Sequence, residues 1–411
     1  MRILVLTHTF PFPLDDGVKL HVYYLLKYLA QTNKIYLLSL SETEVELSIQ
    51  EEIKKLGVTV VGVVTHKIPK SSWARLGNCL FDPVPFFVRQ FESEKFRESI
   101  SHFLNHEKID LVQTDYLATT IYRETFGSLP AIAFPHDAMS MLFYRSAEKE
   151  RNILKRWYLK IQSHKTLQFE RSWLRKFEGL AFVSGFDIQY LHKHCPELSG
   201  IPTIIATGGV DMDYFHPMPG SEAENHTIVF RGVLSFFPNH DAAIYFYTTI
   251  LRKIRKKIPN VRFVIAGKNP NPIWENYRRQ DPNLIVTGFV PDIRTVMAQA
   301  HVVVCPMRAA SGVQNKVLEA MAMAKAIVAT PRACEALNLE DGKQIYLAND
   351  PETFAQKTID LLLNKSARDA LGQRARDYVL KHHQWQSNAI AFNQLYEEIK
   401  TTTQNKPKFQ S

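Results

Sequence analysis

The chain has 411 residues, of which 45% are hydrophobic and 22% are charged, and its formal net charge is +9. This length and composition exclude a disordered chain and leave room for two domains of ordinary size. The sequence contains no run of about eighteen uncharged apolar residues, which argues against a spanning helix, and its four scattered cysteines favour a reducing cytoplasmic compartment over disulfides or structural zinc.

In the first half of the chain, short apolar segments of strand length alternate with segments of helical periodicity. Helices are expected over residues 18–30 and near residues 44–57. The expected strands are residues 2–7, 34–40, 58–64, 110–115, 131–134, 179–184 and 202–207. Strands that alternate with helices form parallel sheets with crossover connections, so these segments predict a doubly wound α/β domain.

A stretch rich in Gly, Pro and acidic residues follows and reads as an interdomain linker, after which the pattern restarts. The expected strands of the second half are residues 227–232, 261–267, 284–290, 301–306 and 326–330, with a helix from about Asn239. The prediction is therefore an α/β protein of two Rossmann-like domains, residues 1–207 and 226–383, that face each other across a cleft.

Open α/β sheets bind ligands outside the carboxyl ends of their strands. The loop after the strand at 301–306 leads into an apolar helix whose beginning contains Gly312, Gln314, Asn315 and Lys316. Free amides at a helix start favour an anion, and Lys316 adds a cation there. Glu319, one turn deeper, could then accept sugar hydroxyls, which together predicts a nucleoside diphosphate sugar site. The alternative is an ion pair between Lys316 and Glu319 that holds the helix end.

The stretch "GVQNKVLEAMAMAK" resembles the signature of retaining GT-B glycosyltransferases of family four (glycosyl transferases group 1), which closes with "LEAMA". The phrases "ATGGVDMDYFHP" and "VTGFVPDIRTVMAQAHVVVCPMR" are similar to the linker and the donor-domain core of that family. The resemblance covers roughly residues 1–381 and is stronger in the second half. The signature stretch is also similar to a subgroup tied to bacterial exopolysaccharide loci.

The resemblance implies transfer of a hexose from a nucleoside diphosphate sugar to a hydroxyl acceptor, with retention and without a cofactor or metal. The second domain would bind the donor and the first the acceptor, with a helix at 384–402 crossing back onto the first domain. Glu319 would hold the ribose. His136 would contact the transferring sugar and is the catalytic candidate, unless it merely packs while Asp137 caps the next helix. The implied donor-binding residues are Gly17, Arg308, Gly312, Gln314, Asn315, Lys316 and Glu319.

Three positions depart from the family pattern. Ser311 stands where the family has the first Glu of its motif, Gly232 is followed by Val233 rather than Arg, and Asn239 replaces a Lys. Lys316 and Arg308 would have to neutralise the diphosphate instead. Two alternatives stay open, a sugar-nucleotide epimerase of the same fold and a non-catalytic relic scaffold. The "DMD" at 211–213 lies in the linker, so no metal site is expected there.

A basic segment runs from Arg145 to Glu178, with ten Lys and Arg against four Glu and with Trp157, Tyr158 and Trp173 between them. "RKIRKK", at 252–257, is a second cluster. Such a segment is either a solvated helix face or a surface for anionic lipid headgroups or a phosphate-bearing acceptor. The partners expected are a nucleotide-sugar donor and a glycan or lipid-linked acceptor at the inner face of the plasma membrane. Nucleic acid is not expected, because no recognised binding motif accompanies the charge.

Overall fold

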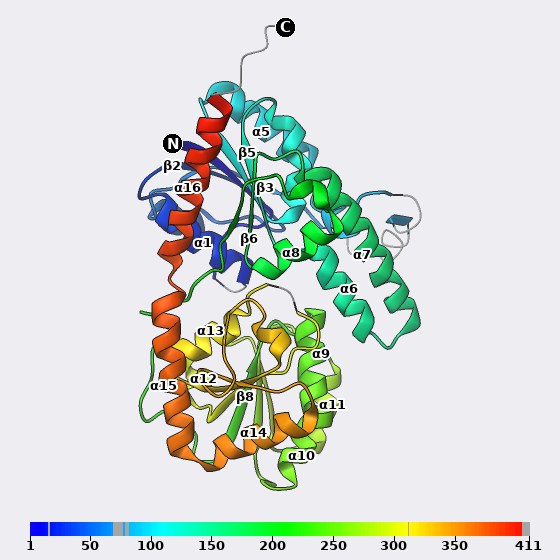
Figure 1. Cartoon of the computed structure of the whole chain (residues 1–411), viewed down its shortest axis with the longest axis vertical. Helices are drawn as coiled ribbons and strands as arrows, with labels where there is room; N and C mark the ends of the chain where they lie inside the picture. Colours follow the sequence, from blue (N-terminus) through cyan, green and yellow to red (C-terminus); the bar gives the residue numbers. More distant parts are fainter. Residues whose placement is uncertain (15–16, 69–76, 79–81, 311, 405–411) are drawn as a thin grey trace. The chain divides into compact units, whose positions relative to one another are not determined.

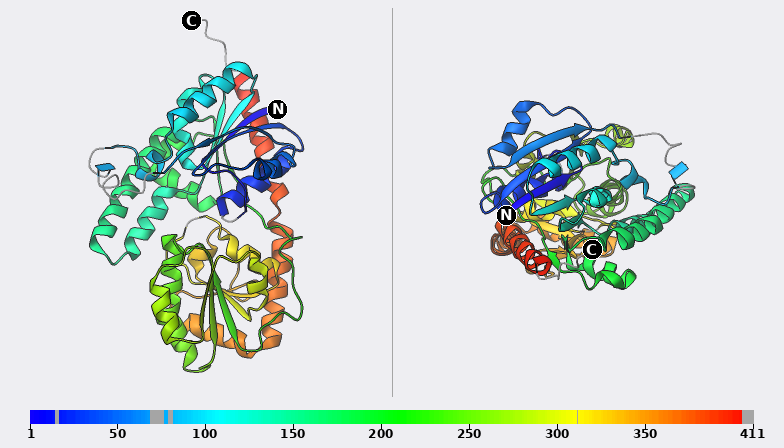
Figure 2. Two further views of the ribbon diagram at one scale, coloured as in Figure 1. Left: turned by 180° about the vertical axis from the view of Figure 1, so that it is seen from behind. Right: turned by 90° about the horizontal axis from the view of Figure 1, so that it is seen from above.

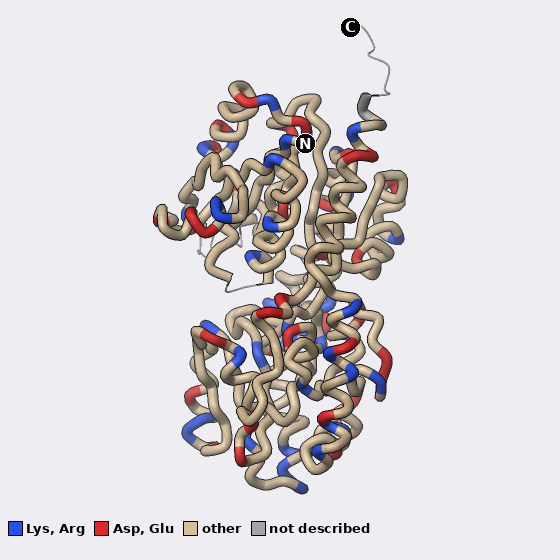
Figure 3. Tube along the Cα trace, turned by 90° about the vertical axis from the view of Figure 1, so that its left-hand side faces the viewer, with Lys and Arg blue, Asp and Glu red and all other residues tan. Residues whose placement is uncertain are grey.

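The computed structural model describes residues 1–14, 17–68, 77–78, 82–310 and 312–404. The chain divides into two compact units: unit 1 comprises Met1–Gly208 with Trp385–Ser411, and unit 2 comprises Gly209–Gln384. Each unit is built on one parallel sheet with helices on its faces (Figure 1). Lys and Arg are interspersed with Asp and Glu over both units (Figure 3).

Unit 1 has a seven-stranded sheet in the order β3-β2-β1-β4-β5-β6-β7. Its strands are β1 (Arg2–Thr7), β2 (Lys34–Ser41), β3 (Thr59–Thr65), β4 (Leu111–Asp115), β5 (Ala131–His136), β6 (Gly179–Phe182) and β7 (Thr203–Ile205). The seven expected strands are thus confirmed, with ends shifted by a few residues. Central strands such as β4 and β5 are buried at every position, because helices cover both faces of a parallel sheet and leave no solvent-facing side.

The helices of unit 1 are α1 (Gly17–Leu29), α2 (Leu47–Lys54), α4 (Phe86–Arg89), α5 (Glu94–His106), α6 (Met139–Lys149), α7 (Ile153–Leu174), α8 (Gly185–His194) and α16 (Trp385–Gln404), with the short helices η1 (Leu117–Phe126) and η2 (Pro196–Leu198). Helix α16 comes from the end of the chain yet lies beside α1 (Figure 1). The Trp385 ring stacks on Tyr24 at 5.0 Å, and Asn33 Nδ2 donates to Asn393 Oδ1 at 2.7 Å. Stacking and polar contacts of this kind tie the last helix to the first strand–helix segment.

Unit 2 has a six-stranded sheet in the order β10-β9-β8-β11-β12-β13, seen from behind in Figure 2. Its strands are β8 (Thr227–Arg231), β9 (Arg262–Ala266), β10 (Leu284–Gly288), β11 (Val302–Cys305), β12 (Ala326–Ala329) and β13 (Tyr346–Leu347). The first five confirm the predicted strands. The two residues of β13 were not predicted, because so short a strand has no alternating or continuous apolar pattern to detect.

The helices of unit 2 are α9 (Phe237–Tyr245), η3 (Phe246–Ile250), α10 (Leu251–Arg255), α11 (Ile273–Gln280), α12 (Ile293–Ala298), α13 (Asn315–Ala322), η4 (Pro331–Cys334), α14 (Pro351–Leu363) and α15 (Lys365–His382). Close backbone packing occurs where β8 and β9 end. Gly267 has φ 155°, and a Cβ atom there would lie 1.8 Å from the Gly232 carbonyl oxygen. A glycine is therefore required for the two loops to pack, which fixes the loop between β8 and α9 beside the sheet edge.

Candidate active site

The carboxyl ends of β8 and β11 lie side by side in unit 2, because the two strands pair in parallel. Strand β8 ends at Arg231, and the chain after β11 leads into α13. Glu319, the acidic residue inside the apolar segment, is 4% exposed and forms an ion pair with Arg231. This contact explains the buried carboxylate, since a buried charge needs a partner of opposite sign.

Arg231 is a site residue that the sequence reading did not identify. The family pattern directs attention to the residue after Gly232, whereas in this chain the cation stands just before that glycine. Burial lowers the pKa of Arg231 to about 10, so the side chain is still a cation at neutral pH. The available signal was an arginine at the end of an otherwise apolar strand, in "TIVFRG". The alternative ion pair between Lys316 and Glu319 is wrong, because Arg231 takes the carboxylate.

Lys316 lies in the first turn of α13 and is 8% exposed. Its Nζ donates to Asn239 Oδ1 at 2.6 Å and to Gln314 Oε1 at 3.2 Å, and the ammonium stands 5.5 Å from the centre of the Phe230 ring. In the described part of the chain, Lys316 has no carboxylate partner. Burial lowers the pKa of Lys316 to about 8, because the charged form has lost water without gaining an anion.

Asn239, which replaces the lysine of the family pattern, orients Lys316. Its Nδ2 donates to the Val233 carbonyl at 3.0 Å while its Oδ1 accepts from Lys316. A Cβ at Gly232 would lie 2.8 Å from Asn239 Cγ, so the absence of a side chain at Gly232 makes room for the amide. Asn239 therefore connects α13 to the loop after β8.

Arg308 reaches the same edge of the sheet but is already paired. Its Nε donates to Asp241 Oδ2 at 3.0 Å, a second nitrogen contacts the other carboxylate oxygen, and the guanidinium lies 4.5 Å from the centre of the Tyr245 ring. A bidentate contact of this kind holds the loop after β11 to α9. Lys316 and Arg308 are the two cations predicted to bind the diphosphate. Arg308 is paired with a carboxylate, whereas Lys316 is held by neutral side chains alone.

The other predicted residues are divided between the units. Gly312 has φ 59° and precedes α13, Gln314 occupies the N-cap position, and Asn315 is the first helical residue. These three lie in unit 2 with Lys316 and Glu319. Gly17 is the first residue of α1 in unit 1 and is exposed. Ser311 lies outside the described residues.

His136 ends β5 in unit 1 and has an unusual backbone. Its φ is 71°, and Tyr116, just after β4, has φ 76°. Left-handed backbone at a residue other than glycine costs on the order of 1–3 kcal/mol and is concentrated at functional sites. The His136 Nε2 lies 2.8 Å from Oδ1 of the fully buried Asp115, which fixes the ring. His136 therefore does not merely fill space in the core.

Polar atoms without partners surround this histidine. Within the described part of the chain, buried atoms of His8, His21, Asp115 and Asp137 have no hydrogen-bond partner: Nδ1, Nε2, Oδ2 and Oδ1 respectively. Burial, reinforced by His136, lowers the pKa of His8 to about 3 and that of His21 well below its usual value, so both rings are neutral at pH 7. Unsatisfied buried donors and acceptors are costly, which suits a ligand that carries hydroxyl groups.

Asp137 does not cap the following helix, which contradicts the alternative considered from the sequence. The amide of Ala138 donates instead to Asp187 Oδ1 at 2.8 Å, and the amide of Ser140 donates to Glu170 Oε1 at 3.2 Å. Burial and the neighbouring Asp187 raise the pKa of Asp137 to about 7. The start of α6 is therefore held by carboxylates from α8 and α7, which leaves the Asp137 side chain available.

Residues 225–364 match the family model "Glycosyl transferases group 1". The chain is also 20% identical, over 97% of its length and 99% of the relative, to an uncharacterized 44.6 kDa protein in the cps region of Klebsiella pneumoniae. The family match includes Arg231, Asn239, Lys316 and Glu319 of unit 2.

Solved structures show the same fold over nearly the whole chain. A sucrose-phosphate synthase from Thermosynechococcus elongatus matches with a TM-score of 0.74 and 14% identity, covering 98% of this chain and 100% of that one. The Anabaena protein HepE, in complex with UDP and glucose, matches with a TM-score of 0.67 and 14% identity, covering 97% and 100%. Residues 225–364 therefore resemble glycosyl transferases group 1, and the chain has the GT-B fold.

Proposed function

We propose that this protein transfers a hexose from a nucleoside diphosphate sugar to a hydroxyl acceptor, with retention of anomeric configuration, in the synthesis of a bacterial exopolysaccharide or another glycan. Two similarities support the proposal. HepE has been crystallised with UDP and with UDP-glucose, and the Klebsiella relative is located in a cps region. UDP-glucose is accordingly the first donor to test.

Lys316 is the observation that carries the proposal. A buried ammonium held by neutral side chains has lost its hydration without electrostatic compensation, so an anion at the start of α13 supplies what is missing. The backbone amides and dipole at the start of a helix favour the same ligand. The diphosphate of the donor is that anion, and Lys316, Arg231 and the amides then stabilise the negative charge that develops as the diphosphate leaves.

Glu319 binds the ribose in this proposal. Its pairing with Arg231 orients the carboxylate, so that it accepts hydrogen bonds from ribose hydroxyls without moving first. In unit 1, the buried polar atoms around His136 that have no partner form hydrogen bonds with hydroxyls of the transferring sugar or of the acceptor. Gly17, at the start of α1, lets the ligand approach the backbone.

Binding of UDP should weaken as the pH rises above about 8. The pKa of Lys316 is about 8 in the free protein, and a bound diphosphate raises it. Below that pKa the lysine is protonated in both the free and the UDP-bound protein, so its protonation does not make the affinity for UDP depend on pH. Above it, binding must take up a proton, and affinity falls by up to about tenfold per pH unit. Calorimetric titration from about pH 7 to about pH 9.5 checks this, and Lys316→Met should abolish the slope.

Transfer should proceed without a divalent metal, because helix amides and two cations are available for the leaving group. The acidic "DMD" has a local role: Asp211 Oδ1 accepts from the amides of Asp213 at 3.1 Å and Tyr214 at 3.0 Å. Initial rates measured with excess chelator should equal those measured without it. A loss of activity that added Mg²⁺ or Mn²⁺ restores would contradict this assignment.

The decisive test is a panel of nucleotide sugars screened by thermal shift, followed by acceptor trials with the sugar that stabilises most. Stabilisation by one donor and its consumption only when an acceptor is present support the proposal. Turnover of the donor without acceptor would identify an epimerase. No stabilisation by any donor, together with no consumption, would identify a relic scaffold.

We further propose that the enzyme works in the cytoplasm, at the inner face of the plasma membrane, on a glycan or lipid-linked acceptor. None of the helices in the described residues is both long and apolar enough to cross a bilayer. Attachment would therefore use a surface, and the basic segment from Arg145 to Glu178 is the candidate raised by the sequence.

A further inference from the structure

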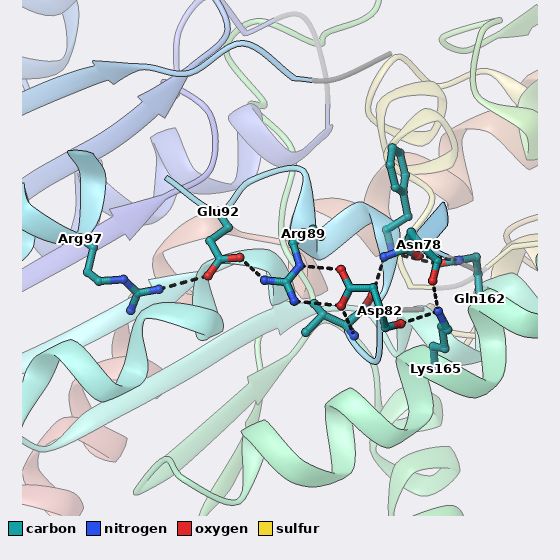
Figure 4. A network of polar contacts seen from close by, with 9 residues as sticks. Asn78, Asp82, Arg89, Glu92, Arg97, Gln162 and Lys165 are labelled. Carbon is teal, nitrogen blue, oxygen red and sulfur yellow. Dashed lines mark hydrogen bonds and ion pairs between the residues drawn. The ribbon is translucent and has the colours of Figure 1, made fainter. Parts of the chain in front are cut away.

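The two halves of helix α7 have different surroundings, although the sequence presents one basic segment. In the second half, Lys165 Nζ donates to the Asp82 carbonyl at 2.5 Å and contacts the Asn78 carbonyl as well (Figure 4). Gln162 Nε2 donates to Asn78 Oδ1 at 3.2 Å, and Asp82 is paired in turn with Arg89. Figure 4 shows these residues as one continuous polar network that anchors this half of α7.

Further basic residues near the end of the segment are also engaged within unit 1. Arg171 pairs with Glu197 at 2.8 Å, and Lys176 pairs with Glu124 at 2.7 Å while lying over the Trp173 ring. The prediction of a membrane surface along the whole segment is therefore too broad. These cations hold the unit together.

The first half of α7 forms a hairpin with α6, and the two helices extend side by side past the sheet of unit 1 (Figures 1 and 2). We call residues 148–160 the hairpin tip. The buried core of unit 1 takes Met141 and Leu142 from α6 and Phe169 from α7, but no residue from the tip. The tip is therefore not needed to complete that core.

Apolar side chains on the tip are exposed. Every residue from 151 to 157 is exposed, and within this run Ile153 is 81%, Leu154 78% and Trp157 49% accessible. Trp157 follows Ile153 by four residues and Leu154 by three, so the three side chains share one face of the helix. Exposing such a cluster is unfavourable in water, and it marks a surface that becomes buried against something apolar.

The same tip is strongly basic. It carries Lys149, Arg151, Lys155, Arg156 and Lys160, all exposed, against the two glutamates Glu148 and Glu150. Across the described residues, none of the five cations takes part in an ion pair. Long basic side chains that flank an exposed apolar cluster complement a surface with negative charge outside and hydrocarbon beneath it.

We propose that the hairpin tip is the membrane-docking site of this protein and that its occupant is a bilayer containing anionic phospholipid. Ile153, Leu154 and Trp157 enter the boundary between headgroups and acyl chains, while the five cations contact lipid phosphates. The combination of charge and exposed apolar surface selects a lipid bilayer over a second copy of the chain, because a basic tip repels an identical one. The inference deepens the proposed attachment to the membrane and is independent of the transfer reaction.

Sedimentation of the full chain with vesicles tests the proposal, without donor or acceptor, so that failure here is distinguishable from failure of the transferase assay. Vesicles of phosphatidylcholine alone are compared with vesicles in which about one third of the lipid is phosphatidylglycerol. Binding should be at least about tenfold stronger to the anionic vesicles and should decrease with salt. The double variants Ile153→Ser/Leu154→Ser and Lys155→Gln/Arg156→Gln should each weaken it roughly tenfold.

Matched controls use similar side chains elsewhere. Lys256→Gln/Lys257→Gln removes two exposed cations from the turn after α10, and Leu363→Ser removes an exposed leucine from α14; both should bind like the wild type. Equal loss in these controls, or no binding by the wild type, would overturn the proposal. So would an unchanged Ile153→Ser/Leu154→Ser variant, since binding would then be purely electrostatic. Light scattering that shows a dimer broken by the same variant would assign the tip to a second copy instead.

Discussion

Replacing Lys316 with Met should lower the affinity for UDP by roughly 10- to 100-fold and leave the affinity for uridine nearly unchanged, since a charged hydrogen bond contributes about 1.5–3 kcal/mol. The thermal unfolding midpoint should change little, because removal of the buried ammonium offsets the donor that Asn239 Oδ1 loses. Methionine fills a similar volume, and the variant no longer buries an ammonium among neutral partners. Titration calorimetry with UDP and uridine, alongside thermal unfolding, checks both expectations.

Lys325 provides a matched control in the same unit. It is also a buried lysine, but its Nζ donates to the carbonyls of Ala298 at 2.7 Å and Ala300 at 3.0 Å. Lys325→Met leaves two buried carbonyls unsatisfied, so it should lower the unfolding midpoint while UDP affinity stays at the wild-type level. Equal loss of affinity for uridine and UDP in Lys316→Met would remove this lysine from the diphosphate site.

Replacing His136 with Asn should lower kcat roughly a hundredfold or more and change the dissociation constant of UDP by less than about twofold. The proposed contact is made to the sugar as it transfers, so it contributes mainly in the transition state. Asn is the better substitution because it tolerates the left-handed backbone at φ 71°, which Ala accommodates poorly. Steady-state rates and UDP titrations on the same preparation separate the two effects.

His164→Asn serves as the control, because this histidine is exposed on α7 and should tolerate the change without loss of rate. His136→Ala provides a second comparison and should lower both kcat and stability, since the left-handed residue is now strained. If UDP affinity collapses in the Asn variant while the unfolding midpoint is unchanged, His136 belongs to nucleotide binding. An unchanged kcat would exclude it from the reaction.

The sequence was sufficient for the parts of this protein that depend on local pattern. The apolar segments that became β1 to β12 were readable because a strand in a two-sided parallel sheet is buried along its length and needs a continuous apolar run. The charges of Lys316 and Glu319 inside an apolar helix indicated that both residues need partners from elsewhere in the fold, and Asn239 and Arg231 supply them. The phrase "LEAMA" in that helix was enough to indicate the family.

Only the tertiary structure determined which charged side chains pair with each other. Arg231 and Glu319 are far apart in the chain and pair because β8 and β11 are neighbours in the sheet. In the same way, Arg308 pairs with Asp241, and Lys316 forms hydrogen bonds with neutral side chains. Side-chain pairing over long sequence separations depends on sheet order and loop packing, and no local periodicity records these.

The basic segment shows the same division. Its composition predicted a surface for anions. Composition alone could not separate Lys165, Arg171 and Lys176, which bind carbonyls and carboxylates of unit 1, from the cations of the hairpin tip. The difference arises because the hairpin extends past the core, so side chains of the same type contact unit 1 at one end of the segment and have no ion pair among the described residues at the other. Residue types and periodicity determined the elements, and three-dimensional packing determined which side chains contact unit 1 and which are exposed.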